Sequence, residues 1–202
     1  MLQVFIGCKI PIDKQNQFGI TREEFNCEFE FPSNEKIISI SEGICNNELT
    51  VIHTIEPMQY DFNELDWNVK YTDSSGSFQL YLQCLYPIVY LTKAYELSED
   101  KRYLDMAEKL ILSWIDYSQS SENRSSNSMI WNDHGAALRT ENIIYYTLTA
   151  DKAEYLNKDT KNIIVELLNR HAEFLLDDSN YTKNHNHGIF QDRAFNVYSL
   201  FS

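Results

Sequence analysis

The residues best suited to chemistry gather in one short stretch near the C-terminal end, YTKNHNHGIFQDRAF from Tyr181 to Phe195. Lysine, asparagine and histidine fill positions 183–187, although the whole chain has only five histidines. A predicted helix begins just after them, and a helix N-terminus offers free N–H groups and a positive dipole end that favour a bound anion. The amide of Asn186 and the imidazole of His187 would make a carboxylate pocket there, with the cation of Lys183 close by in sequence.

Two other interpretations of this stretch stay open at the level of sequence. Asn184 or Asn186 could be the N-cap of the helix while the histidines are solvated, because asparagine is a preferred cap. His185 and His187 could instead bind a metal ion from one side of an extended segment. Zinc usually takes three or four protein ligands, and no third ligand is near in sequence. We therefore expect neither a metal nor another cofactor.

A second stretch, MIWNDHGAALRTENIIYY from Met129 to Tyr146, brings aromatic and basic residues to the start of another predicted helix. The face of Trp131 and the guanidinium of Arg139 suit a sugar ring and its carboxylate, and His134 would add a polar contact. The alternative is structural. Asp133 would then cap the helix, Arg139 would pair with an acid, and Trp131 would seal the preceding loop.

Composition excludes several classes of function. The chain has 202 residues, 43% of them apolar, which is enough for one well-filled core. Its formal net charge of −13 argues against nucleic acid as a partner, because phosphate binding depends on Lys and Arg. No apolar stretch approaches the roughly 20 residues that cross a bilayer, so we expect no membrane partner.

The N-terminal sequence MLQVFIGCKIPIDK has neither a basic leader nor a long apolar stretch. It predicts no export signal and, by default, a cytoplasmic location. The cysteines are Cys8, Cys27, Cys45 and Cys84, at wide and unrelated spacings. Such spacings fit neither a metal knuckle nor a disulfide framework, and we expect free and mostly buried thiols.

The periodicity of apolar residues predicts a small β segment followed by helices. Between residues 21 and 56, alternation around Phe25–Phe31 and Leu49–Ile55 predicts strands. A helical period then takes over. The predicted helices span 77–97, bent or split at Pro87, 100–117, 134–150, 159–176, and a fifth from near His187. A serine-rich stretch at 118–128 predicts a projecting loop.

The fifth predicted helix is still apolar and aromatic where the sequence ends, with Phe195, Tyr198 and Phe201 and no capping residue. This indicates the front of a longer helical array, cut at its C-terminus. We expect these three side chains to form an apolar patch through which the chain associates with itself or with another chain.

The segment from Trp131 to Asn142, with its ALRTEN, and the segment NHNHGIFQDRA together resemble the N-terminal helical domain of the heparinase II/III-like polysaccharide lyases. FNELDWNVKY at 62–71 fits the entrance to that domain. The resemblance covers roughly residues 62–202, and Asn186-His187-Gly188 is its most specific element.

This resemblance implies a mainly α fold, an incomplete (α/α) toroid of antiparallel helical hairpins. Residues 1–62 would be a small β-containing N-terminal segment, and 63–202 the start of the toroid. Members cleave uronic-acid polysaccharides by β-elimination, and an Asn with its adjoining His neutralises the substrate carboxylate. These roles map onto Asn186 and His187, with Arg139, Trp131, His134 and Lys183 as substrate contacts.

The resemblance also implies that the site is incomplete. Family members use a catalytic Tyr on a later helix and commonly a His or Tyr from a β-sandwich domain, all expected beyond residue 202. The partner expected is an anionic polysaccharide or oligosaccharide, and the chain alone is expected to be inactive. The alternative is a carbohydrate-binding or scaffolding helical module without catalysis.

Overall fold

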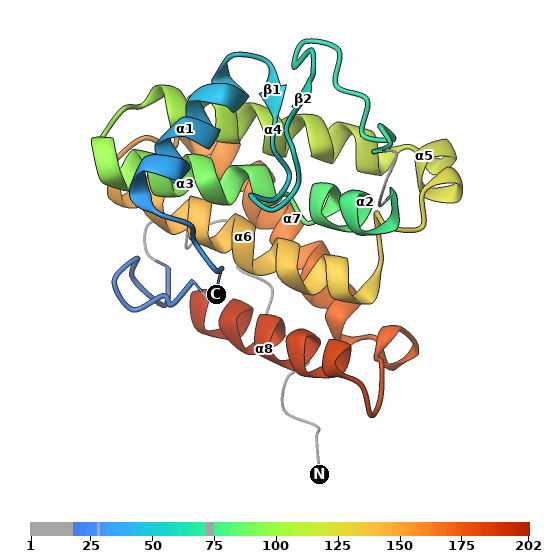
Figure 1. Cartoon of the computed structure of the whole chain (residues 1–202). Helices are drawn as coiled ribbons and strands as arrows, with labels where there is room; N and C mark the ends of the chain where they lie inside the picture. The colour runs from blue at the N-terminus through green and yellow to red at the C-terminus, as the bar shows by residue number, and fades with distance from the viewer. Residues whose placement is uncertain (1–17, 28, 72–74) are drawn as a thin grey trace.

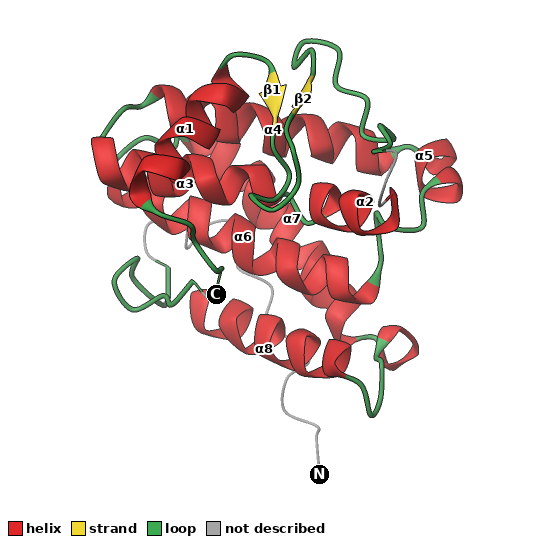
Figure 2. Ribbon diagram, in the orientation of Figure 1, coloured by secondary structure: helices red, strands yellow, loops and turns green. Residues whose placement is uncertain are grey.

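The computed structural model describes residues 18–27, 29–71 and 75–202, and helices dominate that part of the chain (Figures 1 and 2). The helices are α1 (Asn34–Cys45), α2 (Ser75–Gln83), α3 (Tyr86–Ser98), α4 (Arg102–Gln119), α5 (Ser121–Ser126), α6 (Asp133–Lys152), α7 (Lys158–Leu176), the short 3-10 helix η1 (Asp178–Asn180) and α8 (Asn186–Phe201). Strands β1 (Glu48–Leu49) and β2 (Met58–Gln59) form one antiparallel pair, with Glu48 opposite Gln59.

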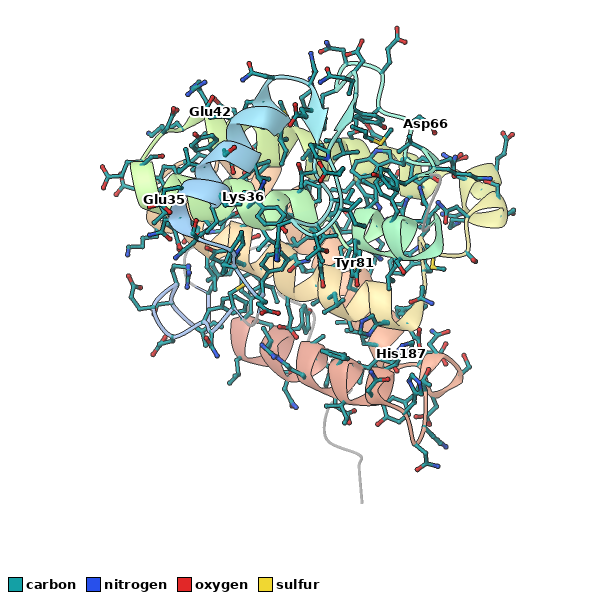
Figure 3. The ribbon with its side chains drawn as sticks, viewed as in Figure 1. Glu35, Lys36, Glu42, Asp66, Tyr81 and His187 are labelled. Atoms are coloured by element: carbon teal, nitrogen blue, oxygen red, sulfur yellow. The ribbon has the colours of Figure 1, made fainter. Side chains whose placement is uncertain are left out.

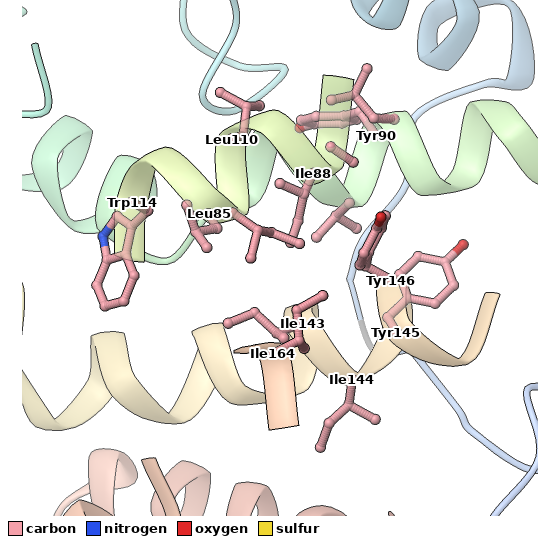
Figure 4. Close-up of a cluster of buried hydrophobic side chains, with 14 of the residues drawn as sticks. Leu85, Ile88, Tyr90, Leu110, Trp114, Ile143, Ile144, Tyr145, Tyr146 and Ile164 are labelled. Atoms are coloured by element: carbon pink, nitrogen blue, oxygen red, sulfur yellow. The ribbon is translucent and has the colours of Figure 1, made fainter. Parts of the chain in front are cut away.

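Helix α6 is the centre of the arrangement. It packs against α3, α7 and α8, and Figure 1 shows it running between α3 and α8. Nearly every residue from Gly135 to Ala150 is buried, as expected for a helix covered on all sides. By contrast, α4 has one apolar face, and the side chains of that face are buried against α3. The hairpins α3–α4 and α6–α7 build the core drawn in Figure 4.

Helix prediction from periodicity is confirmed for α4, α6, α7 and α8, with ends within a few residues of those predicted. The split at Pro87 is also confirmed. Pro87 lies in the first turn of α3, where its missing N–H costs no hydrogen bond. Leu85, with φ 60°, makes the turn between α2 and α3. The serine-rich stretch is not wholly a loop, because it contains the short helix α5, capped by Ser120.

The strands predicted between residues 21 and 56 are mostly wrong. Only β1 falls in that range, and residues 34–45 form helix α1 instead. Ser33 caps α1, and Ile37, Ile40 and Ile44 bury one helical face against α3. Phe29 and Phe31 are in irregular backbone. Their rings pack on the helices, with Phe29 edge-on to Tyr90 at 5.1 Å between ring centroids.

The expected apolar patch at the end of α8 is also wrong, because Tyr198 and Phe201 are completely buried. Phe18 stacks on Phe201 with ring centroids 4.2 Å apart, and the N–H of Gly19 donates to the Phe201 carbonyl at 2.9 Å. The Tyr198 hydroxyl donates to Asn169. The predicted self-association therefore loses the surface on which it was based.

Two smaller findings complete the fold. Of the four cysteines, Cys27, Cys45 and Cys84 are free, and only Cys84 is fully buried, while Cys8 lies outside the described residues. Among the helices of the described ranges, none has the length and apolarity to span a bilayer.

Candidate active site

The start of α8 is held by a cap and by the loop in front of it. His185 is the N-cap, and its ring Nδ1 accepts the N–H of His187 at 3.3 Å. An asparagine is therefore not the cap. The Gln191 side chain accepts the Thr182 N–H at 3.0 Å and donates to the Asn180 carbonyl at 2.8 Å. These bonds tie the connecting loop to the first turns of α8.

Gly188 lets the chain pass close to the helix. A Cβ at this position would lie 2.5 Å from the Thr182 carbonyl oxygen and 3.1 Å from the Tyr181 hydroxyl oxygen. Only a residue without a Cβ fits there without a shift of the backbone. The glycine after Asn186 and His187 thus has a steric role, and it sets how close the loop comes to these two residues.

Asp133, in the first turn of α6, orients His187. Its Oδ2 lies 3.1 Å from the His187 Nδ1 and also accepts a hydrogen bond from the Thr182 hydroxyl, while Oδ1 accepts the N–H of His134 at 2.7 Å. Burial alone would raise the pKa of Asp133, but the bonds from Thr182, His134 and His187 together lower it. An ionised carboxylate can only accept, so Nδ1 of His187 carries a hydrogen.

Three imidazoles gather at this point. The His134 and His187 rings stack with centroids 4.6 Å apart, His185 lies edge-on to His187 at 4.3 Å, and Phe190 lies edge-on to His134 at 4.6 Å. Burial lowers the pKa of His134, and the neighbouring His187 lowers it further. Figure 3 shows His187 at the end of α8 that meets the start of α6. The two stretches singled out in the sequence therefore meet at this point.

The histidine cluster does not have the geometry of a metal centre. In the described ranges, no group of three or more His, Cys, Asp or Glu side chains is arranged to hold a metal ion. The two-histidine alternative from the sequence gains no third ligand from the fold.

A cleft of about 440 Å³ opens beside this cluster. Its walls come from segments far apart in sequence: Cys27, Phe29 and Glu30, residues 52–54, Tyr81 of α2 and Tyr86 of α3, the first half of α6, and α8. His134 and Phe190 line it directly, so the stacked His187 lies next to its edge. The volume falls within the roughly 300–1,000 Å³ that is usual for small-molecule sites.

A buried ion pair lies in the cleft wall. Arg193 of α8 contacts Glu141 of α6 with 3.0 Å between guanidinium nitrogen and carboxylate oxygen. Burial raises the pKa of Glu141 to about 7, and the neighbouring guanidinium opposes this rise by favouring the ionised carboxylate. The pair therefore offsets the positive charge of Arg193 in the wall.

Arg139 does not have the expected position of a substrate contact. It is completely buried, and its guanidinium lies over the rings of Trp114 and Trp131, 4.0 and 5.6 Å from their centroids. Its N–H groups donate to the His171 ring and to two backbone carbonyls, those of Gln83 and Ile130. These three partners are neutral, so the alternative in which Arg139 pairs with an acid is not observed either. Arg139 of α6 therefore links this helix by hydrogen bonds to the end of α2 and to α7.

The remaining predicted contacts divide between core and surface. Trp131 is half buried and covers Arg139, with the Phe174 ring at 5.3 Å on its other side. Asn186 and Lys183 are exposed around the start of α8. Asn186 and His187 thus stay available to a ligand, and the roles of Asn186, His134 and Lys183 remain proposals.

Sequence reasoning missed the contributions of His53, Glu141 and Arg193 to the cleft. Glu141 and Arg193 each sit on a predicted helix near a singled-out motif, which is a signal for proximity but not for pairing. His53 had no such signal, because the segment 49–55 was interpreted as a strand.

Comparison with solved structures finds chains with a similar fold. Heparan sulfate lyase HepC from Pedobacter heparinus aligns with a TM-score of 0.71 and 11% identity over 93% of this chain and 30% of its own. A heparinase III solved with methylated lysines aligns with a TM-score of 0.74 and 15% identity, over 94% and 31% of the two chains. The fold is that of the heparinase III (α/α) toroid.

The likeness to the heparinases is one of structure. At these identities it establishes the fold alone, and the chain spans about a third of the length of the heparinases it matches. No family model and no curated protein matched the sequence. The incomplete toroid predicted from the sequence is confirmed, and the chain has a polysaccharide lyase-related fold.

Proposed function

We propose that this chain is the toroid part of a polysaccharide lyase that cleaves a uronic-acid polysaccharide by β-elimination. The observation that carries the proposal is the pairing of Asn186 and His187 at an exposed helix N-terminus, with His187 oriented by Asp133 beside a cleft of ligand size. The two similar structures are named as heparan sulfate lyase and heparinase III, which supports the same class of substrate.

The chemistry explains why such residues are needed. A base removes the weakly acidic proton next to the uronate carboxylate, a double bond forms in the ring, and the glycosidic oxygen leaves with a proton from an acid. Negative charge moves onto the carboxylate as the proton departs. Donors already in place stabilise this charge without having to reorganise during the reaction. Such electrostatic stabilisation is usually the largest single contribution to catalysis.

In this proposal the chain's own residues divide the work. The Asn186 amide donates to the carboxylate at the positive end of the α8 dipole, and His187 in its imidazolium form donates from Nε2 while Asp133 accepts from Nδ1. His134 supports the His187 ring by stacking. The acid and base are proposed to lie beyond residue 202, so the described toroid would bind the carboxylate but not transfer the proton.

The test is a comparison of the chain with the protein that contains it together with the following several hundred residues. Both are incubated with unsulfated and sulfated uronic-acid polymers, and unsaturated uronate is followed by its ultraviolet absorbance. The longer protein should release it and the 202-residue chain should not. If the longer protein binds the polymers without cleaving them, the non-catalytic binding module is correct instead.

Within the longer protein, Asn186→Ala should lower kcat far more than it changes KM, because the carboxylate needs its donor most in the transition state. Losing one preorganised donor costs on the order of a hundredfold to a thousandfold in rate. Asn184→Gly is the control, since Asn184 lies exposed in the loop two residues before Asn186 and its φ of 59° is one that glycine adopts freely. A kcat within about threefold of the parent would remove Asn186 from the proposed role.

A further inference from the structure

His53 lies in the cleft but belongs to none of the motifs near α6 and α8. It is half buried in the turn after β1, and with Ile52 and Thr54 it forms one segment of the cleft wall, separate from Cys27, Phe29 and Glu30. His134 lines the same cleft from α6. The cleft therefore has imidazoles on two separate segments, and only one of them belongs to the cluster around His187.

Tyr90 of α3 holds His53 through two contacts to one hydroxyl. The Tyr90 oxygen accepts the His53 backbone N–H at 2.9 Å and lies 3.2 Å from the His53 ring Nδ1. Tyr90 is completely buried, and Phe29 packs edge-on against its ring at 5.1 Å. The hydroxyl is thus a fixed anchor behind the cleft wall.

The hydrogen positions follow from this geometry. Burial raises the pKa of Tyr90 to about 12, so the hydroxyl keeps its proton at neutral pH. Its oxygen accepts the His53 backbone N–H, and among the described residues Nδ1 is the one acceptor in reach of the hydroxyl hydrogen, so we assign that hydrogen to the Tyr90–Nδ1 bond. A neutral His53 then carries its ring hydrogen on Nε2, and it presents a hydrogen-bond donor rather than an acceptor.

We propose that His53 is a substrate-binding residue of the cleft, held by Tyr90 as an Nε2–H donor to a carboxylate or hydroxyl oxygen of the polysaccharide. This inference rests on the proposed function, since it concerns the same substrate. Sugar units of a uronic-acid polymer present many acceptor oxygens, and a donor fixed in place binds them without the entropy cost of ordering a free side chain. Tyr90 is a positioning residue, because it acts through His53.

The first test observes the imidazole of the 202-residue chain directly by ¹⁵N NMR. The parent should show the Nε2–H tautomer of neutral His53, and Tyr90→Phe should shift His53 toward a mixture of tautomers. Tyr103→Phe is the matched control, because it removes a tyrosine hydroxyl that donates to Glu42 instead. An Nδ1–H tautomer in the parent, or no change in Tyr90→Phe, would overturn the proposal.

The second test uses the longer protein and its kinetics. His53→Ala should raise KM about threefold to tenfold with a smaller change in kcat, as expected for loss of one hydrogen bond made equally in ground and transition states. His53→Gln restores an N–H donor, so its KM should lie between those of the parent and His53→Ala. Tyr90→Phe should also raise KM, but less than His53→Ala does.

The outcomes separate this inference from the proposed function. If the parent turns over a uronic-acid polymer and His53→Ala leaves its KM within about twofold, His53 is not a substrate contact and the lyase assignment stands. If the parent cleaves no such polymer, the proposed function fails, and the substrate role of His53 fails with it, whatever the tautomer experiment shows.

Discussion

Asn186 and His187 are neighbours in sequence but differ in how the fold treats them. The Asn186 side chain lies exposed on the first turn of α8, where the helix dipole already favours an anion. His187 is half buried between two other imidazoles and is tied to Asp133. One residue is therefore placed by the helix end alone, and the other by a contact between α6 and α8.

Asp133 can be tested for its orienting role. Asp133→Ala in the longer protein should lower kcat/KM about tenfold or more, because a hydrogen bond to a charged group contributes about 1.5–3 kcal/mol. Asp133→Asn, whose amide oxygen can still accept the Nδ1–H, should retain more activity. In the 202-residue chain, ¹⁵N NMR should show Nδ1–H for His187 in the parent and a mixture in Asp133→Ala.

Asp192→Asn provides the control for Asp133, since it removes the same charge from the same region. Its carboxylate accepts a hydrogen bond from the Tyr181 hydroxyl, whereas the His187 ring faces Asp133. Equal losses in Asp133→Ala and Asp192→Asn would show that the general negative charge matters, and that the specific contact with His187 does not.

The candidate site could be predicted from sequence only where a local feature marks it. Asn186 and His187 precede a clear helical pattern, so the helix end itself identified them. Arg139 also lies near a helix start, but periodicity does not reveal that Trp114, His171 and Gln83 enclose it. The pairing of His53 with Tyr90 joins positions 37 apart through a side chain, which no local pattern encodes.

At the scale of elements, prediction from apolar spacing succeeded for helices that bury one face. It failed where contacts with distant segments determine the local structure. The apolar spacing in α4 and α7 matches a single buried stripe, and both helices were found. In α1, Ile38 adds an apolar residue beside the stripe of Ile37, Ile40 and Ile44, and two serines interrupt it, which blurs the helical period. The alternation around Phe29 reflects rings that reach helices from irregular backbone.

The loop–helix junction before α8 predicts a strong dependence on Gly188. Gly188→Ala should destabilise the chain by about 1–3 kcal/mol, because its methyl group would lie 2.5 Å from the Thr182 carbonyl oxygen, a backbone atom that cannot move alone. Urea denaturation followed by circular dichroism measures the change as a lower midpoint.

Gly76→Ala is the matched control in α2. Among described atoms, nothing lies within 4 Å of a Cβ built at Gly76. Alanine there should stabilise the helix by up to about 1 kcal/mol by reducing the freedom of the unfolded chain. If Gly188→Ala behaved like Gly76→Ala, the close approach of the Thr182 carbonyl would not constrain the junction.

At the scale of the whole molecule, the core contains a polar centre. His171 is completely buried, its Nε2 accepts from the Arg139 Nε–H at 2.8 Å, and its Nδ1 lies 2.9 Å from the Leu167 carbonyl oxygen. A neutral ring with its hydrogen on Nδ1 satisfies both contacts, because Nδ1–H donates to the carbonyl and Nε2 accepts from Arg139. A second proton would have no acceptor and would meet the Arg139 cation.

This centre predicts acid sensitivity. Burial, followed by the charge of Arg139, lowers the pKa of His171 well below its usual value. The unfolded chain binds this proton below about pH 6.5 and the folded chain does not, so stability is lost as pH falls through that range, by up to about 1.4 kcal/mol per pH unit. A pKa that is lower in the folded chain than in the unfolded chain always gives stability that decreases as the pH falls.

The measurement is the free energy of unfolding in urea between about pH 5 and pH 7, for the parent and for His171→Gln. Glutamine can still accept from Arg139 but does not titrate. The variant should be less stable than the parent at pH 7, and the difference should shrink on acidification. A difference that stays constant with pH would show that His171 does not link protonation to folding.

The contact of Phe18 with Phe201 has a consequence for the order in which the molecule folds. It closes a loop of about 180 residues, whereas the α3–α4 and α6–α7 hairpins close over a few residues each. Because long loops lose more chain entropy on closure, the hairpins should form first, and α8 and residues 18–31 should join them last. Part of the cleft wall, including Phe29, Phe190 and Arg193, comes from those late segments. During refolding, the backbone amides of α3, α4 and α6 should therefore become protected from hydrogen exchange well before those of α8. A ligand in the cleft should slow the opening of α8.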